Sequence, residues 1–254
     1  MPFVHGFHPV REALRRRPHQ VLRVLIARRE SGPRVRELTE LCARHGVHAE
    51  LIDWGELRRV VPEARQGTAA EVTEVAWVNR ERPCAGEIGA GPVARAGEPR
   101  RARDPGLVVL LEDVQDPRNL GALLRVCEGA GVGRVLVRDR GSAPVTPIVV
   151  QASSGATEWL DIERVTNSAA ELRRLKEGGF WIYGAAAGGV PPWEVDLTGP
   201  VVLCFGGEAR GLRRLTRERC DGLIGLPMRG RVESLNVATA AAALLYEAVR
   251  QRTA

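Results

Sequence analysis

The second half of the chain alternates short apolar runs with helical patterns, and this alternation restricts the fold more than any other feature. The apolar runs lie near residues 107–113, 134–138, 158–165, 180–185, 201–205 and 222–226. Strands that alternate with helices favour a parallel sheet with helices on both faces. Such sheets bind ligands at the carboxyl ends of their strands, so we expect the functional site in the loops after these runs.

The first 78 residues carry a shorter pattern of the same kind. Helices are expected over residues 9–17 and 34–45, and strands over residues 21–27, 48–52 and 70–78. The stretch that follows is rich in Gly, Pro, Ala and Arg without periodicity, which is typical of a flexible linker. The sequence therefore predicts a small N-terminal α/β domain (1–78), a linker (79–106) and a C-terminal domain (107–254).

Three of the expected strands run into polar loops. The first is followed by Asp116-Pro117, a helix cap with proline at the first helical position. The second ends at Gly206-Gly207, where the backbone can approach a ligand closely, and Glu208 follows. The third leads into Ser234-Leu235-Asn236. We expect Ser234 to cap an alanine-rich helix that begins near Leu235, with Asn236 inside its first turn.

These three segments, in this order, resemble the motifs of the SpoU/TrmH family of RNA ribose 2'-O-methyltransferases. The motif residues are Asn119, Gly121 and Arg125 in DPRNLGALLR, Glu208 and Gly211 in GGEARGL, and Ser234-Leu235-Asn236 in LPMRGRVESLNVA. The resemblance covers about residues 105–250. VHGFHPVREAL (4–14) and RQGTAAEV (65–72) resemble the small substrate-binding domain of the RlmB-like branch, whose members act on a guanosine of 23S rRNA, although RQG departs from the more usual HQG.

The resemblance implies more about the fold than the alternation does. It implies a C-terminal parallel-sheet α/β trefoil-knot (SPOUT) domain preceded by a small α/β (L30e-like) substrate-binding domain. Periodicity alone would never suggest a knot, because knots are rare in proteins. The resemblance also implies a homodimer through the C-terminal domain, and the alanine-rich face of the last helix would suit close packing against a partner.

The implied methyl donor is S-adenosyl-L-methionine. On the family pattern, backbone groups and apolar walls for this cofactor come from Gly206, Gly207, Gly211, Ile224, Leu226, Met228, Ser234 and Leu235. Taken one at a time, these residues also fit the strand ends and turns of a buried sheet.

The implied catalytic residues surround Arg125, and they are Arg125, Asn119, Glu208, Ser234 and Asn236. Two roles are open for Arg125. It is either a base neutralised by its surroundings, although a neutral guanidine is costly to populate, or a cation that holds a phosphate and polarises the ribose hydroxyl. Glu208 either orients that arginine, accepts the proton, or forms a surface ion pair with Arg210 or Arg214.

The RNA contacts expected from the resemblance involve His8, Arg11, Arg65, Gln66, Ser153 and Ser154. Ordinary solvated residues and a plain helix end are the alternatives. The net charge is +6 with Lys176 as the one lysine among 37 basic residues, and 4% of residues are aromatic. We therefore expect RNA affinity to come mainly from phosphate contacts rather than from base stacking.

Several other classes of protein are disfavoured. The five histidines are scattered without carboxylate partners at ligand spacing, so no metal site is expected. GAGVG (129–133) follows a helix and precedes a strand, which is the reverse of a dinucleotide fingerprint. The five cysteines lack paired metal-site spacing and are expected to be reduced. No run is long and apolar enough for a membrane span or a signal peptide, so a cytoplasmic location is expected.

The preferred interpretation is a ribose methyltransferase that acts on a guanosine of large-subunit ribosomal RNA. A tRNA ribose methyltransferase and an antibiotic-resistance rRNA methyltransferase share the chemistry and stay open. A catalytically inactive RNA-binding ribosome-assembly factor is the alternative from another class, and the complete set of catalytic residues argues against it.

Overall fold

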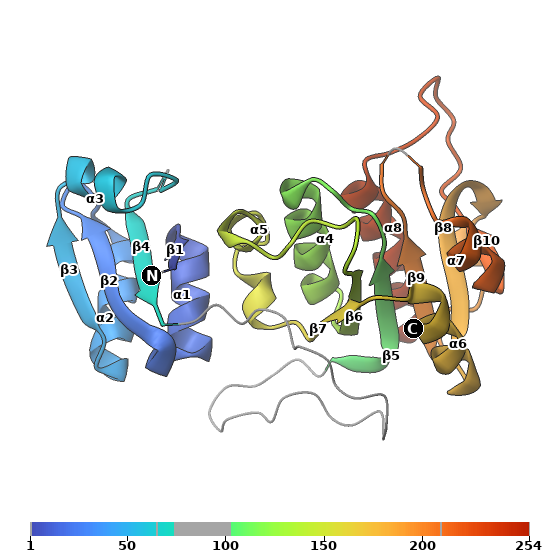
Figure 1. The fold of residues 1–254 in the computed structure, drawn as a ribbon, viewed down its shortest axis with the longest axis horizontal. Coiled ribbons are helices and arrows are strands. Elements are labelled where there is room, and N and C mark those ends of the chain that lie inside the picture. Colours follow the sequence, from blue (N-terminus) through green and yellow to red (C-terminus); the bar gives the residue numbers. More distant parts are fainter. Residues whose placement is uncertain (1, 65, 74–102, 209, 254) are drawn as a thin grey trace. The chain divides into compact units, whose positions relative to one another are not determined.

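The structure is a computed structural model that describes residues 2–64, 66–73, 103–208 and 210–253. The chain divides into two compact units, shown as ribbons in Figure 1. Unit 1 contains Met1–Trp77 and Val145–Trp159, and unit 2 contains Val78–Pro144 and Leu160–Ala254. The domains expected from the sequence are each continuous, whereas unit 1 includes a second segment. Most of the expected linker lies outside the described residues.

Unit 1 is a four-stranded mixed sheet with helices on both faces. The strand order is β1 (Phe3–His5), β4 (Thr68–Val72), β2 (Val21–Ala27) and β3 (His48–Ile52). Strand β2 runs parallel to β3, and β4 runs antiparallel to β1 and β2. The helices are α1 (Phe7–Arg16), α2 (Pro33–His45) and α3 (Trp54–Val60). The expected strand over 70–78 is β4, and the rest of that range from residue 74 is not described.

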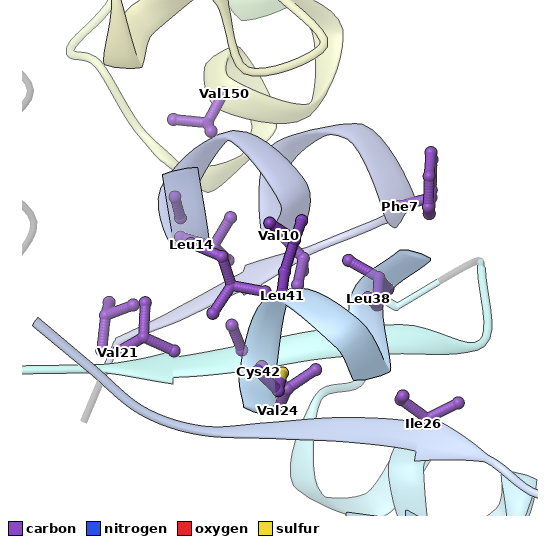
Figure 2. Packing of buried hydrophobic residues seen from close by; sticks show 14 residues of the cluster. Phe7, Val10, Leu14, Val21, Val24, Ile26, Leu38, Leu41, Cys42 and Val150 are labelled. Atoms are coloured by element: carbon purple, nitrogen blue, oxygen red, sulfur yellow. The ribbon is translucent and has the colours of Figure 1, made fainter. Parts of the chain in front are cut away.

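Alternate residues of β2 point to opposite faces, as the two-residue period of a strand requires. Val24 and Ile26 pack with Leu14 of α1 and Leu38 of α2, as Figure 2 shows. Leu25 and Ala27 point to the other face of the sheet and pack against Leu57 of α3. A strand buried on both faces reads as a continuous apolar run, which is what residues 24–27 show.

The segment 145–159 forms part of unit 1, although it lies between two strands of unit 2 in the sequence. It contains α5 (Pro147–Ala152) and a short turn, Ala156–Glu158. Val150 belongs to the same apolar core as α1 and α2 (Figure 2). Glu158 accepts two hydrogen bonds from the Arg17 guanidinium, at 2.8 and 2.9 Å, and both side chains are buried. The expected strand over 158–165 is therefore wrong at its start, because Glu158 is held in this turn and β7 begins only at Ile162.

Unit 2 is built on a six-stranded sheet in which every pair of neighbours is parallel, as predicted. The order is β10 (Gly222–Ile224), β8 (Trp181–Val190), β9 (Val201–Phe205), β5 (Asp104–Leu111), β6 (Val132–Arg138) and β7 (Ile162–Val165). All carboxyl ends of these strands therefore lie at one edge of the sheet, which we call the carboxyl edge.

Helices cover both faces of this sheet. On one face, Leu172 and Leu175 of α6 (Ser168–Glu177) pack on Val108, Leu110 and Val202. The short helix α7 (Arg214–Arg219) contacts α6 and β8. On the other face, α4 (Pro117–Gly129) and α8 (Val237–Thr253) pack against each other, and α8 also contacts β9. The chain thus returns from β10, at the end of the sheet, to its middle.

The alanine-rich face of α8 is used within unit 2. Ala238, Ala241 and Ala248 are buried together with Leu244 and Leu245 in the single chain. A small side chain at these positions lets α8 lie close to its own sheet and to α4. The expectation that an alanine-rich face of this helix packs against a partner chain stays a prediction, since Ala243 is exposed and Ala240 and Ala242 are half-buried.

The ion pair between Arg17 and Glu158 gives a direct test of how segment 145–159 is held. Glu158→Ala leaves a buried guanidinium without its carboxylate, which should lower the free energy of unfolding by about 3–5 kcal/mol. Glu218→Ala is the matched control, because it removes one partner of the exposed pair Arg214–Glu218 and should cost under about 1 kcal/mol. Urea denaturation followed by circular dichroism measures both. Equal losses in the two variants would contradict the role of the buried pair.

Candidate active site

The first motif occupies the start of α4. The Asp116 carboxylate accepts a hydrogen bond of 2.8 Å from the Arg118 backbone N–H, and Pro117 is the first helical residue, as predicted. This cap fixes the beginning of the helix at the carboxyl end of β5. Asn119 follows in the first turn, and Arg125 lies six residues later, about 9 Å further along the helix axis.

The third motif ends in the cap of α8, but the capping residue is Asn236. Its Oδ1 accepts from the backbone N–H of Ala238 at 2.9 Å, and its carbonyl accepts from Ala240 at 2.9 Å. The helix begins at Val237, so the expectation that Ser234 caps it and that Asn236 lies inside its first turn was wrong. Asparagine is as favourable a cap as serine, and its position directly before the helix decides between them.

A hydrogen-bonded relay connects all three motifs. Asn236 Nδ2 donates to Asn119 Oδ1 at 3.0 Å, and Asn119 Nδ2 donates to Glu208 Oε1 at 2.5 Å. The backbone N–H of Ala238 can only donate, so it fixes which end of the Asn236 amide faces it. That orientation then fixes the Asn119 amide. The relay therefore presents Glu208 with a donor and holds its carboxylate at the carboxyl edge.

Glu208 does not form the surface ion pair that was its alternative explanation. Arg214 pairs with Glu218 instead, at 2.5 Å, and the Arg210 side chain has no acidic partner among the described residues. Glu208, the last residue of the relay, is exposed. An exposed carboxylate with one oxygen engaged by an amide keeps its other oxygen available to a ligand.

The relay brings together three of the five predicted catalytic residues. Arg125 and Ser234 are exposed, and within the described part of the chain their side chains form no hydrogen bond or ion pair. An exposed guanidinium without a carboxylate is free to bind an anion.

The glycines of the second motif are required by close backbone packing. A side chain at Gly206 would collide with the backbone of Gly211, and one at Gly207 would collide with the carbonyl of Asp113. Gly211 has a left-handed conformation (φ 62°), and its N–H donates to the Gly207 carbonyl at 2.9 Å. These glycines fold the loop back on itself just before and after Glu208.

The backbone of Asp113 lies against Gly207 of this loop. This role of Asp113 was not anticipated from the sequence. It has a positive φ of 53°, which is uncommon outside glycine. Its carboxylate pairs with Arg138 at 2.9 Å and with Arg213 at 3.4 Å. The residue therefore ties the ends of β5 and β6 to the start of α7.

A cavity of about 410 Å³ opens beside the third motif. It is lined by Ala187, Gly188, Gly189, Leu226, Pro227, Met228, Gly230, Val232 and Glu233. Leu226 and Met228 were predicted to contact the cofactor, whereas Ile224 is buried in the sheet and Ser234 and Leu235 are exposed outside the lining. The three lining residues at the end of β8 were missed. The run of small residues 184–189, which overlaps the end of the expected strand 180–185, was the signal that could have identified them.

Two buried cysteines of unit 2, Cys127 and Cys204, are poor nucleophiles. Burial raises the pKa of the Cys204 thiol well above its usual range and that of Cys127 to about 12. A thiol is a nucleophile only as its thiolate. Neither residue is therefore suited to covalent catalysis at neutral pH, and the oxygen-rich relay is the better candidate for the chemistry.

The predicted RNA contacts of unit 1 lie near the start of α1. Gln66 Oε1 accepts from the backbone N–H of Phe7 at 3.2 Å, so this side chain caps the helix. The guanidinium of Arg11 lies 5.4 Å from the Phe7 ring centre and pairs with Glu12 at 2.7 Å, and the His8 ring meets the same ring edge to face. Arg34, which was missed, lies over that ring as well, at 5.4 Å. Arg65 is outside the described residues.

The two serines of segment 145–159 differ in exposure. Ser153 is buried and its hydroxyl donates to the Val150 carbonyl at 2.9 Å, so in this structure it lines no surface. Ser154 is half-buried with a positive φ of 54°. Among the described residues, no group of three or more acidic, His or Cys side chains is arranged to hold a metal ion. No described helix is long and apolar enough to cross a membrane.

Comparison with known proteins agrees with this geometry. The model of the SpoU rRNA methylase family matches residues 106–246, and that of the RNA 2'-O ribose methyltransferase substrate-binding domain matches residues 3–78. The 23S rRNA (guanosine-2'-O-)-methyltransferase RlmB of Pseudomonas putida is 37% identical over 251 residues, which is 98% of this chain and 96% of the relative. The RlmB of Xanthomonas axonopodis pv. citri is 40% identical over 98% of this chain and 96% of the relative.

A solved structure shares the whole fold. The SpoU methyltransferase AviRb of Streptomyces viridochromogenes, in complex with the cofactor AdoMet, has a TM-score of 0.72 and 25% identity over 99% of this chain and 90% of that chain. The family predicted from the three motifs is confirmed by these matches. The protein belongs to the SpoU rRNA methylase family.

Proposed function

We propose that the protein transfers a methyl group from S-adenosyl-L-methionine to the ribose 2'-hydroxyl of one guanosine in 23S rRNA. The observation that carries the proposal is the relay from Ala238 through Asn236 and Asn119 to Glu208. The relatives whose names state this reaction extend over nearly all of the chain, which includes unit 1. Both parts of the chain therefore support a single enzyme rather than an isolated binding domain.

The residues present fit the proposed cofactor. A cavity of about 410 Å³ is within the range of small-molecule sites, and its lining is mostly small and apolar, with Glu233 as the charged group. We assign Leu226 and Met228 to the walls of this cavity. The other predicted cofactor contacts do not line it and are kept as neighbours of the same site, namely Gly206, Gly207, Gly211, Ile224, Ser234 and Leu235. The sulfonium methyl of S-adenosyl-L-methionine supplies the electrophile, so the protein has to orient the ribose and remove its proton.

Glu208 and Arg125 divide that task. Glu208 Oε1 is occupied by Asn119, which leaves Oε2 to accept the proton of the ribose 2'-hydroxyl as its oxygen gains the methyl group. We assign Arg125 the role of a cation that binds a phosphate or the ribose oxygen. It is exposed and has no acidic partner among the described residues, so its guanidinium is available to an anion. Ser234, which is exposed in the loop before α8, is kept as a ligand contact.

The alternatives differ in substrate or in activity. A tRNA substrate and a resistance methylation of rRNA require the same relay, and full-length similarity to 23S rRNA enzymes favours the housekeeping rRNA reaction. An inactive assembly factor would have no use for a relay that orients Glu208. In unit 1 we propose that His8, Arg11, Gln66 and Ser154 lie near bound RNA, together with Arg65.

The test of this function is methylation of ribosomal RNA from a strain that lacks the gene. Purified protein with S-adenosyl-L-methionine should methylate one guanosine of 23S rRNA, and mapping of 2'-O-methyl sites identifies it. Arg125→Ala should reduce turnover at least a hundredfold, because this cation contacts the reacting ribose. Arg173→Ala, an exposed arginine of α6, is the matched control and should behave as wild type. Methylation of tRNA alone, or full activity of Arg125→Ala, would contradict the proposal.

Asn236 allows its two roles to be separated. Asn236→Ser keeps a capping oxygen for α8 but removes the amide that donates to Asn119, so stability should change little while kcat falls about tenfold, or about 1.4 kcal/mol. Asn236→Ala loses the cap as well, so its free energy of unfolding should also fall by about 1 kcal/mol. Single-turnover kinetics and thermal denaturation measure the two effects. Wild-type kcat in Asn236→Ser would show that the relay has no part in catalysis.

We also propose a cytoplasmic homodimer that associates through unit 2, whose last segment is threaded as a trefoil knot. Support for the knot is the return of the chain from β10 to place α8 beside α4 and β9. Support for the dimer is the exposure of large apolar side chains on α8 and the preceding loop, namely Tyr246, Met228, Val232 and Leu235.

The dimer proposal predicts an effect of charge on α8. Tyr246 is 52% exposed and Leu215 of α7 is 56% exposed, so the two form a matched pair. Tyr246→Glu should shift the protein towards the monomer by placing a charge in the interface, whereas Leu215→Glu should leave the dimer intact. Light scattering at micromolar concentration gives the mass of each. A monomeric wild-type protein, or two variants that behave alike, would refute this arrangement.

A further inference from the structure

The arginines of unit 2 fall into two groups according to their partners. The paired group binds carboxylates: Arg134 with Glu163 and Glu171, Arg174 with Glu171, Arg250 with Glu247, and Arg252 with Asp104. A second group is exposed, and its side chains have no acidic partner among the described residues. Five members of this second group follow strand ends, namely Arg118, Arg140, Arg210, Arg229 and Arg231, and we call these five the edge arginines.

The edge arginines share one place in the fold. Arg118 follows β5, Arg140 follows β6, Arg210 follows β9, and the other two follow β10. Since all strands of this sheet are parallel, these loops lie at the carboxyl edge. Figure 1 shows the loop after β10 extending beyond the strand ends. The relay and the cavity lie at this same edge.

Four of the five edge arginines are also close in sequence to a residue of the proposed site. Arg118 directly precedes Asn119, and Arg210 lies two residues after Glu208. Arg229 and Arg231 flank Gly230, which lines the cavity. The acidic residues on these loops do not neutralise them. Asp113 is occupied by Arg138 and Arg213, Asp116 caps α4, and Glu208 accepts from Asn119. Glu112 accepts from Thr216, and Asp139 and Glu233 form no ion pair with an edge arginine among the described residues.

Exposed cations around one site create a positive potential that attracts anions, and the chemistry of the loops indicates which anion. The loops 112–118, 139–146, 206–213 and 225–236 contain no Phe, Tyr or Trp. Stacking of bases on aromatic side chains is therefore unavailable in these loops, whereas guanidinium groups bind phosphate with two hydrogen bonds. A chain of phosphodiesters matches several separated cations better than a single small anion does.

We propose that the edge arginines bind the phosphates on either side of the target nucleotide and so lay the RNA backbone across the carboxyl edge. The inference rests on the proposed function and adds to it the path of the RNA over unit 2. Phosphate contacts fix the register of a nucleic acid without reading its sequence. The edge arginines then position the ribose at the relay, and base identity is read elsewhere.

The test compares two triple variants with the same loss of charge. Arg118→Ala/Arg140→Ala/Arg210→Ala removes edge arginines that do not line the cavity. Arg173→Ala/Arg217→Ala/Arg219→Ala is the control, since these exposed arginines of α6 and α7 have no acidic partner among the described residues and lie on helices that cover one face of the sheet. Thermal denaturation checks that both variants fold. Binding of a 23S rRNA fragment and of an unrelated single-stranded RNA of equal length is measured from 50 to 300 mM salt, values chosen to span about a twofold change in screening length.

Each phosphate contact on single-stranded RNA contributes about 0.7 to the slope of log affinity against log salt, so the edge variant should lose about 2 units of slope. Its KM for RNA should rise at least tenfold, and its affinity should fall on both RNAs. The control should keep the slope and KM of the wild type. Equal slopes for the two triple variants would overturn the proposal. Wild-type methylation in the same assay distinguishes that outcome from failure of the proposed function, which would leave the wild type inactive on 23S rRNA.

Discussion

A single backbone N–H determines the orientation of the candidate active site. The N–H of Ala238 fixes the Asn236 amide, which fixes the Asn119 amide, which in turn donates to Glu208. Each amide has one donor end and one acceptor end, so the direction set at the start of α8 passes to the carboxylate without ambiguity. Asn119 and Asn236 are 117 residues apart in the sequence, and only the fold brings them together. The site therefore depends on where α8 begins, and a cap that usually matters for helix stability also serves the chemistry.

The sheet beneath the relay explains why the loops are rich in glycine. Strands β5 and β9 are neighbours, so the loops that leave them compete for the same space at the carboxyl edge. Because Gly206 and Gly207 have no side chain, the loop after β9 can pack closely. Gly207 lies against the backbone of Asp113, and Gly206 lies against the backbone of Gly211 in the same loop. Asp113 accepts a positive φ at the same point and uses its carboxylate to hold two arginines. The glycines are thus required for close backbone packing within the protein. The same packing holds Glu208 on a tightly folded loop, where a ligand can reach it.

Sequence reasoning identified most of this architecture and several of its details. The parallel sheet, the cap at Asp116 and strand β9 follow from apolar runs and cap residues, which report local structure directly. It failed where distant contacts decide. Glu158 was assigned to a strand because its neighbours are apolar, and only the partner Arg17, 141 residues away, explains the turn that it occupies. The bond from Phe7 to Gln66 forms a cap that no local pattern displays, and the predicted RNA contact of Gln66 stays a prediction. The cap at Asn236 was misplaced by two residues, which is the usual uncertainty of helix ends.

The distribution of arginine shows why composition alone was a weak guide to RNA binding. A net charge of +6 says that the surface is basic but not where the charge is available. Arg134 satisfies two glutamates and Arg252 a single aspartate, so these residues contribute to the total while offering little to a polyanion. The arginines that remain unpaired beside the relay are the ones with the potential to attract phosphate, since their field is not cancelled locally. The structure shows which arginines are paired with carboxylates and which are not. The positions of the unpaired arginines, rather than the net charge, therefore indicate where RNA can lie.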